Sequence, residues 1–230
     1  MRTTPAAIFW DMDGTLVDTE PLWEQFTYEL SELMGRRLTP QLRETTIGGS
    51  FRHTIEVCAT HAGITVTDDD HPRYREFMND RMGELMRASL APNPGITELL
   101  DDLATRDLPM LVTTNTERSL ADISIGAVGR QYFVDSVTGD EVPSPKPAPD
   151  MYLRAAEIVG ADPADCLVFE DSVTGMTAAV TAGCRVIGLP WYPDTRVPEG
   201  VVTLESLHGR NDFRGADADT VMEWFHQLQR

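Results

Sequence analysis

The sequence predicts an α/β fold, a Rossmann-like, doubly wound parallel sheet with an all-helical domain inserted after the first strand. Two observations support this prediction. The apolar run at residues 6–10 is followed by a long stretch in which apolar residues recur at helical spacing. From residue 96 onward, short apolar strands alternate with amphipathic helices, which is typical of a parallel sheet covered on both faces.

The first predicted strand, residues 6–10, lies between Pro5 and Gly14 and is followed by two acidic residues, Asp11 and Asp13. Residues two apart in an extended segment point the same way, so both carboxylates can leave the strand tip together. Neighbouring carboxylates repel each other, and one resists ionisation unless a cation lies beside them. Mg²⁺ binds hard oxygen ligands of this kind, so the pair is a candidate magnesium site.

The stretch after the first strand, up to residue 91, contains no convincing strand. Its apolar spacing predicts helices over 22–34, 52–61 and 74–90. Between the first two, Gly48 and Gly49 followed by Ser50 indicate a tight loop that brings backbone close to a ligand. We therefore predict an α/β core formed by residues 1–17 and 92–230, and a helical cap domain formed by residues 18–91.

The second half of the chain predicts the rest of the sheet. We expect helices over 96–106, 118–128, 149–159, 174–182 and 218–228, and strands over 110–114, 134–137, 166–169, 185–189 and 201–203. In open parallel sheets, ligands bind at the carboxyl ends of the strands. The residues that follow each strand are therefore the candidates for chemistry.

Polar residues follow two more of the predicted strands. Thr114 and Asn115 end the second strand, where a hydroxyl and an amide can hold phosphate oxygens beside the start of the next helix. Glu170 and Asp171 follow a later strand and form a second carboxylate pair. Because these strand ends meet at one edge of the sheet, the pattern predicts an anion and metal site there.

Lys146 is the only lysine in the sequence, and it lies in a loop that prolines stiffen on both sides. A general preference for arginine in this chain would explain why lysine is absent elsewhere, and on that reading the one lysine is accidental. A site that needs a compact, rotatable positive charge explains why one lysine is retained. We favour the second interpretation because the loop leads into the region that faces the acidic pairs.

Composition limits the possible partners. The 230 residues carry a net charge of −18 with a pI near 4.5, which argues against binding nucleic acid or an anionic membrane through bulk electrostatics. No apolar run reaches transmembrane length, and the apolar stretch near the N-terminus is too short for a signal peptide. Three widely spaced cysteines without a CxxC pair are typical of a reducing compartment. We expect a cytoplasmic monomer.

Four motifs in this order resemble those of the haloacid dehalogenase (HAD)-like hydrolase superfamily. They are DMDGTLVDTE at 11–20, Thr114-Asn115, Lys146 within KPAPD, and EDSVTGM at 170–176. The resemblance covers essentially the whole chain, including a helical cap inserted after the first motif. Within the superfamily, residues 20–23 and the loop 48–50 resemble the subgroup that contains β-phosphoglucomutase and small sugar-phosphate phosphatases.

This resemblance implies a mechanism. Asp11 would attack phosphorus and form an aspartyl-phosphate, and Asp13 would act as the general acid and base with its backbone carbonyl on Mg²⁺. Asp171, together with Asp11 and Glu170, would complete the metal site. Thr114, Asn115 and Lys146 would bind the phosphate, which makes the expected partner a small phosphorylated metabolite such as a sugar or polyol phosphate.

The cap is expected to decide the substrate, and its candidate contacts are Gly48, Gly49, Ser50, Arg52, His53 and Glu20. Glu20 in the first turn of a helix and His53 on the surface also have ordinary structural explanations. A cap without lysine argues against the phosphonate hydrolases of the family, which form a Schiff base there. Asp13 and the pair Glu170-Asp171 argue against the dehalogenases.

Two alternatives to a phosphatase stay open. A sugar-phosphate mutase must hold a second phosphate on its cap, and here only Arg43 and Arg52 could do so. In β-phosphoglucomutase an arginine directly follows the loop serine, whereas this chain has Phe51 there, and a displacement by one residue turns a helical side chain by about 100°. We therefore favour a phosphatase. A non-catalytic phospho-aspartate signalling domain fits less well, because the second acidic pair follows the lysine.

Overall fold

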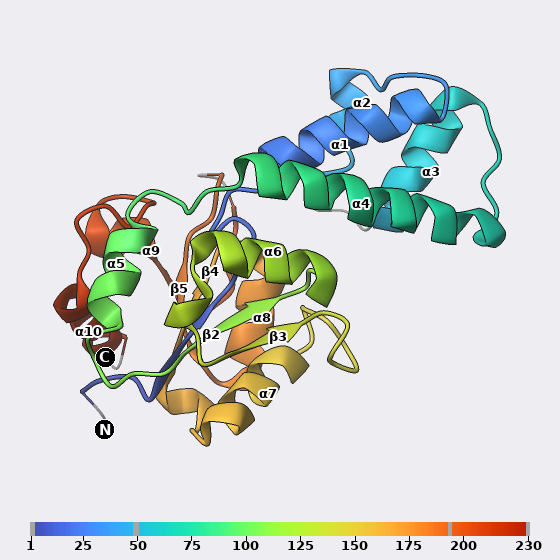
Figure 1. The fold of residues 1–230 in the computed structure, drawn as a ribbon. Helices are drawn as coiled ribbons and strands as arrows, with labels where there is room; N and C mark the ends of the chain where they lie inside the picture. Colours follow the sequence, from blue (N-terminus) through green and yellow to red (C-terminus); the bar gives the residue numbers. More distant parts are fainter. Residues whose placement is uncertain (1–2, 48–50, 193–194, 229–230) are drawn as a thin grey trace. The chain divides into compact units, whose positions relative to one another are not determined.

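The core of the protein is a six-stranded, fully parallel sheet with the strand order β3-β2-β1-β4-β5-β6. The computed structural model describes residues 3–47, 51–192 and 195–228. The strands are β1 (Ala7–Trp10), β2 (Met110–Thr114), β3 (Asp135–Thr138), β4 (Cys166–Glu170), β5 (Arg185–Gly188) and β6 (Val201–Thr203). The predicted α/β fold, a Rossmann-like doubly wound sheet, is confirmed (Figure 1).

Helices cover both faces of this sheet, as the alternating pattern predicts. One face packs against α5 (Ile96–Leu103), α6 (Arg118–Val128) and α10 (Ala218–Gln227). The other face packs against α7 (Asp150–Val159) and α8 (Val173–Ala182). Successive residues of β1 point to opposite sides, with Ile8 in the first apolar cluster and Phe9 in the second. Burial on both faces explains why the central strands are continuously apolar.

Contacts between Cα atoms divide the chain into two compact units, Met1–Asp18 with Leu90–Arg230, and Thr19–Ser89. The second unit is entirely helical. It consists of α1 (Glu20–Leu33), α2 (Pro40–Glu44), α3 (Phe51–Ala62) and α4 (His71–Ser89), with a short 3₁₀ turn before α4 (Figure 1). Phe26 of α1 packs against Phe51 and Phe77, which joins three of these helices through aromatic contacts.

The pattern of apolar residues missed two short helices. These are α2 and α9 (Leu204–His208), each five residues long. Such a helix is too short to show a repeating apolar stripe, and its start is set by a single capping residue. Thr39 accepts a hydrogen bond from the Leu42 amide, and Thr203 accepts one from the Ser206 amide.

Strands β1 and β4 are held in register next to their carboxyl ends. Trp10 lies opposite Phe169 in the ladder, and their rings stack with centroids 4.5 Å apart. The residues that follow, Asp11 and Glu170, therefore leave neighbouring strands side by side. The Asp11 amide also donates to the Phe169 carbonyl at 3.0 Å, which extends the ladder into the site.

The turn after Asp13 is fixed by the chain that returns at residue 90. Gly14 adopts a φ of 93°, which favours glycine, and its amide donates to the Val17 carbonyl at 2.7 Å. The side-chain amide of Asn93 donates to the carbonyls of Gly14 and Thr15, at 3.2 Å and 2.9 Å. The backbone next to Asp13 is thus tied to the core unit. None of the helices within the described residues has the length and apolarity needed to cross a membrane.

Candidate active site

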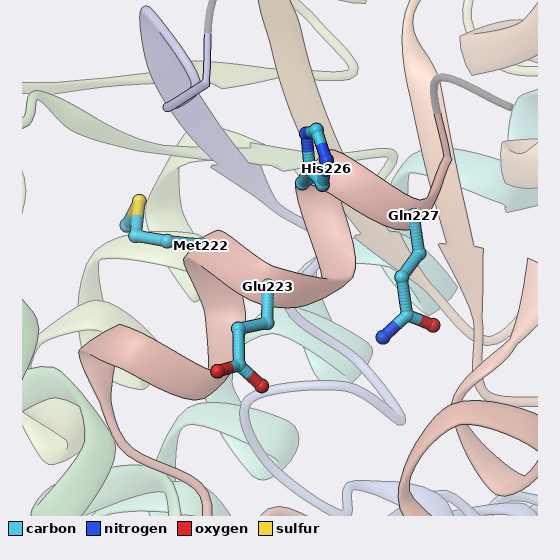
Figure 2. A pocket seen from close by; sticks show the side chains of 4 residues that line it. All are labelled: Met222, Glu223, His226 and Gln227. Carbon is cyan, nitrogen blue, oxygen red and sulfur yellow. The ribbon is translucent and has the colours of Figure 1, made fainter.

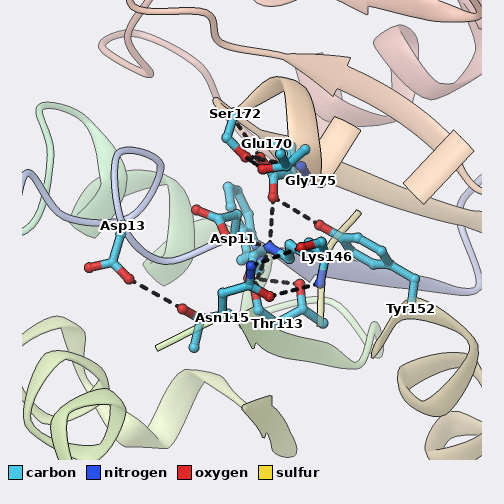
Figure 3. A network of polar contacts seen from close by, with 12 residues as sticks. Asp11, Asp13, Thr113, Asn115, Lys146, Tyr152, Glu170, Ser172 and Gly175 are labelled. Atoms are coloured by element: carbon cyan, nitrogen blue, oxygen red, sulfur yellow. Dashed lines mark hydrogen bonds and ion pairs between the residues drawn. The ribbon is translucent and has the colours of Figure 1, made fainter. Parts of the chain in front are cut away.

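The residues singled out after the strands of the core come together at the carboxyl edge of the sheet. Asp11 follows β1, Thr114 ends β2, and Glu170 ends β4, so all three leave neighbouring parallel strands. Lys146 lies in the loop between β3 and α7, and Figure 3 shows its side chain among Asp11, Glu170 and Tyr152. The structure therefore brings together four groups that lie far apart in the sequence.

The Lys146 ammonium group lies at the centre of this site. It donates to Asp11 Oδ1 at 2.6 Å, to Glu170 Oε1 at 2.6 Å and to the Thr113 carbonyl at 3.0 Å. These three acceptors match the three hydrogens of the ammonium group. Burial alone would lower the pKa of Lys146, but the carboxylates of Asp11 and Glu170 hold it well above its ordinary value. Lys146 is therefore charged at any physiological pH.

Glu170 is fully buried, and donors surround its carboxylate. Besides Lys146, the Tyr152 hydroxyl donates to Oε1 at 3.2 Å. The amide and hydroxyl of Ser172 donate to Oε2 at 2.9 Å and 3.0 Å. Hydrogen bonds to both oxygens offset the cost of burying this carboxyl group.

Gly175 in α8 makes room for the Glu170 side chain. A Cβ atom built on Gly175 would lie 1.5 Å from Glu170 Oε1, far inside van der Waals contact. Any larger residue at this position would force the carboxylate away from Lys146. The glycine of the fourth motif is thereby explained by packing against the site and not by its backbone angles.

Tyr152 of α7 belongs to the site, although none of the sequence motifs includes it. Its ring centroid lies 5.3 Å from the Lys146 ammonium nitrogen, in addition to the hydroxyl contact with Glu170 (Figure 3). Burial and the charge of Glu170 raise the pKa of Tyr152 well above its ordinary value, so the hydroxyl stays a donor. A signal was available, because a tyrosine on a buried helical stripe needs a partner for its hydroxyl.

Asp11 has one carboxylate oxygen on Lys146 and one with no hydrogen-bond partner among the described residues. That second oxygen, Oδ2, is buried. Burial raises the pKa of Asp11 well above its ordinary value, Glu170 raises it further, and Lys146 opposes both. An unpartnered buried carboxylate oxygen is costly unless another group binds it.

A metal ion is the kind of group that this oxygen fits. Carboxylate oxygens of Asp11, Glu170 and Asp171 lie within 4.8 Å of one another. Burial and the charge of Glu170 raise the pKa of Asp171 to about 7. Gly14 allows Asp171 to approach, since a Cβ built on it would lie 2.1 Å from Asp171 Oδ2. An all-oxygen, anionic donor set of this kind fits a hard divalent cation.

Asp13 is held by a separate pair of hydroxyl groups. Its Oδ2 accepts hydrogen bonds from Thr114 Oγ1 at 3.2 Å and Thr116 Oγ1 at 2.7 Å. Asp13 therefore has different partners from Asp11, although the two carboxylates are only two residues apart. Thr116 was not predicted from the sequence; it lies in the bend after β2, where its amide donates to Thr114 Oγ1 at 3.0 Å.

Asn115 contacts the backbone of Lys146. Its Oδ1 accepts from the Lys146 amide at 2.9 Å, and its Nδ2 donates to the Lys146 carbonyl at 3.3 Å. The phosphate-binding role predicted for Asn115 stays a prediction, as do the roles predicted for Thr114 and Lys146. The contacts of the Asn115 side chain that the structure describes are with the protein.

The candidate cap residues lie in the helical unit. Arg43 is buried and binds Glu20 at 2.5 Å, although the Glu20 side chain is 51% exposed. Arg52 binds Asp68 at 3.0 Å on the surface. His53 Nε2 lies 3.1 Å from the Thr45 carbonyl. The loop residues Gly48, Gly49 and Ser50 lie outside the described residues. Their predicted contacts with substrate stay predictions.

A surface hollow lies on α10 and is separate from the acidic site. Four residues of that helix line it: Met222, Glu223, His226 and Gln227 (Figure 2). All four come from two turns of one helix, so the hollow is a depression along a helix face. It contains none of the residues that the sequence motifs single out, and we assign it no role.

Comparison with known proteins agrees with the geometry of the site. The model of the haloacid dehalogenase-like hydrolase family matches residues 8–189. The chain belongs to this family. The family prediction made from the four motifs is therefore confirmed, and so is the predicted enzyme class, a HAD-like phosphatase.

Curated relatives include two phosphatases. The chain is 29% identical over 185 residues to the phosphorylated carbohydrates phosphatase of Thermotoga maritima, covering 80% of this chain and 84% of the relative. It is 31% identical over 184 residues to the fructose-1-phosphate phosphatase of Escherichia coli, covering 79% and 95%. The crystal structure of CbbY from Rhodobacter sphaeroides in complex with phosphate has a TM-score of 0.80 at 23% identity, covering 95% and 99%, which shows a shared fold.

Replacing Gly175 by alanine tests the arrangement around Glu170. The added methyl group would displace the Glu170 carboxylate, so we expect both a lower free energy of unfolding, by about 2 kcal/mol or more, and a large loss of activity. Urea denaturation and hydrolysis of p-nitrophenyl phosphate measure the two effects.

Gly126→Ala is the matched control. Gly126 lies in α6, and a Cβ built there meets nothing within 4 Å, so alanine should stabilise this helix slightly and leave activity unchanged. Wild-type stability and activity in Gly175→Ala would contradict the packing described for Glu170.

Proposed function

We propose that the protein is a Mg²⁺-dependent phosphatase that hydrolyses a small phosphorylated metabolite, a sugar or polyol phosphate, through an aspartyl-phosphate on Asp11. The observation that carries the proposal is the asymmetric environment of Asp11. One carboxylate oxygen is bound to Lys146, and the other is buried, unpartnered among the described residues and close to Glu170 and Asp171. This is the arrangement that a carboxylate nucleophile beside a cation site requires.

In the first step, Asp11 forms a bond to phosphorus and the bond from phosphorus to the ester oxygen breaks. Asp13 donates a proton to the departing alkoxide, which leaves as an alcohol. In the second step, Asp13 takes a proton from water, the water oxygen attacks phosphorus, and the bond to Asp11 breaks. Thr114 and Thr116 hold the Asp13 carboxylate in place for both proton transfers.

The surrounding groups supply charge and orientation. Lys146 favours the ionised form of Asp11 against the effect of burial, and it carries a positive charge toward an incoming phosphate dianion. Glu170 holds Lys146 in place from the other side. Asp11, Glu170 and Asp171, with the backbone carbonyl of Asp13, would hold Mg²⁺. When bound, Mg²⁺ neutralises phosphate charge and orients the phosphate for in-line displacement.

Substrate choice is assigned to the helical unit. We propose that residues 18–91 form a cap whose contacts with the substrate come from Glu20, the loop 48–50, Arg52 and His53. Two of the phosphatases to which the chain is similar are described as acting on phosphorylated carbohydrates and on fructose 1-phosphate, which supports a sugar phosphate. We also propose that the protein is a monomer and that it binds neither nucleic acid nor a membrane.

A mutase is the competing function, and the cap arginines argue against it. A mutase needs cap cations that can hold a second phosphate while the first reacts. Arg43 is buried against Glu20, which leaves Arg52, in an exposed ion pair with Asp68, as the one candidate of the two that could reach a phosphate. A panel of sugar phosphates separates the two functions. Release of inorganic phosphate supports the phosphatase, whereas conversion of glucose 1-phosphate to glucose 6-phosphate without release would support the mutase.

The nucleophile is tested by Asp11→Asn. This variant keeps the size of the side chain and removes the charge, so we expect turnover of p-nitrophenyl phosphate to fall by at least about 10³-fold. In Asp13→Asn, the phosphoenzyme should still form slowly but remain trapped. Mass spectrometry detects it as an added phosphoryl group. Wild-type hydrolysis by Asp11→Asn would exclude Asp11 as the nucleophile.

The metal site predicts a pH dependence of Mg²⁺ binding. The pKa of Asp171 is raised from 3.8 to about 7, so the metal-free folded protein holds a proton that the unfolded chain has already lost. Between these pH values, the free energy of unfolding without metal therefore falls as pH rises. Mg²⁺ must displace that proton, so its apparent affinity should rise by about tenfold per pH unit up to about pH 7.

Isothermal titration calorimetry between pH 5.5 and 8 measures this dependence. Asp171→Asn serves as the comparison, because it has no proton to lose at this position and should bind Mg²⁺ weakly with a smaller change across the range. An affinity of the wild-type protein that does not vary with pH would contradict the raised pKa of Asp171.

A further inference from the structure

Asn115 forms a reciprocal pair of hydrogen bonds with Lys146. The Lys146 amide donates to Asn115 Oδ1 at 2.9 Å, and Asn115 Nδ2 donates to the Lys146 carbonyl at 3.3 Å. Both polar groups of the lysine backbone are thus bound by one side chain (Figure 3). An asparagine amide can do this because it carries a donor and an acceptor side by side, which is the arrangement that a neighbouring strand would offer.

The ammonium group of Lys146 is bound by the same chain segment as its backbone, the end of β2. The Thr113 carbonyl, two residues before Asn115, accepts a hydrogen bond from the Lys146 ammonium group at 3.0 Å. The end of β2 therefore holds Lys146 at its backbone and at its charged tip. Between these two contacts, the Thr114 hydroxyl donates to Asp13. Three consecutive residues thus bind both the lysine and the proposed acid–base carboxylate.

Fixing both ends matters because a lysine side chain is long and flexible. Four rotatable bonds separate the backbone from the ammonium group, so a small shift of the backbone carries the charge away from Asp11. The loop that bears Lys146 supplies no strand ladder to hold it, since residues 139–149 lie between β3 and α7. Displacements of about 1 Å at a reacting centre can cost about 100-fold in rate.

We infer that Asn115 is a positioning residue that acts through Lys146, and that it sets where the ammonium group stands relative to Asp11. This inference rests on the proposed function, because the proposed phosphatase reaction is what gives Lys146 a role in catalysis. It differs from the phosphate contact that the sequence predicts for Asn115. A phosphate contact would act on the substrate directly, whereas a positioning residue acts only when Lys146 is present.

The first experiment uses the fact that Lys146 is the only lysine. Protein labelled with ¹³C at lysine Cε gives one lysine signal, which reports on Lys146 without assignment. We expect Asn115→Ala to move and broaden this signal in a protein that remains folded. Asn211→Ala is the control, because Asn211 donates in the same way to a backbone carbonyl, that of Pro190, and within the described part of the chain it has no hydrogen bond to a partner of Lys146. An unchanged lysine signal in folded Asn115→Ala would overturn the inference.

The second experiment is a double-mutant cycle. Asn115→Ala should lower kcat for p-nitrophenyl phosphate by about 10- to 100-fold, with little change in KM. In a Lys146→Arg background, in which the charged group already has another shape and reach, the same substitution should have a much smaller effect. Equal effects in both backgrounds, together with a matching rise in the inhibition constant of inorganic phosphate, would identify a phosphate contact and overturn the inference.

The two experiments distinguish this inference from the proposed function. A wild-type protein that hydrolyses none of the phosphate esters would refute the phosphatase, but the lysine signal would still report whether Asn115 holds Lys146. An active wild-type protein with an unperturbed lysine in Asn115→Ala would refute the positioning role alone.

Discussion

A single buried ammonium group, shared between two carboxylates, is the interaction on which the site depends. Lys146 lies 2.6 Å from both Asp11 and Glu170. Without it, two acidic groups would share a space that excludes water, and at least one would take up a proton. A protonated Asp11 could not attack phosphorus. The lysine therefore makes the nucleophile possible, and it does so at a position that only three distant chain segments together define.

The fold supplies this arrangement through constraints on backbone and packing. Stacking of Trp10 on Phe169 sets β1 beside β4 immediately before Asp11 and Glu170. Gly175 leaves the volume that the Glu170 carboxylate occupies. Tyr152 of α7 packs its ring near the Lys146 ammonium group, and its hydroxyl donates a hydrogen bond to Glu170. Replacing a buried ion pair by one partner alone is strongly destabilising, so these residues serve stability and chemistry together.

The sequence was sufficient to predict the sheet and the residues at its carboxyl edge, because apolar periodicity and the polar residues after each strand are local signals. Asp11 and Glu170 could be named for that reason, and Lys146 could be named because it is the only lysine, in a loop stiffened by prolines. The partners of these residues could not. That Asn115 faces the Lys146 backbone, or that Tyr152 reaches Glu170, depends on how distant segments pack, and no spacing in the chain encodes it. In the helical unit, the ion pair of Arg43 with Glu20 is likewise a long-range contact.

The charge of Lys146 is tested most directly by its own titration. In protein labelled at lysine Cε, the single ¹³C signal should keep the position of a protonated amine at pH values above the ordinary lysine pKa of about 10.4, as long as the protein stays folded. Glu170→Gln removes one of the two carboxylate partners and should bring the transition to lower pH. A wild-type lysine that loses its proton at or below about pH 10.4 would contradict a buried ammonium group held in its charged form by Asp11 and Glu170.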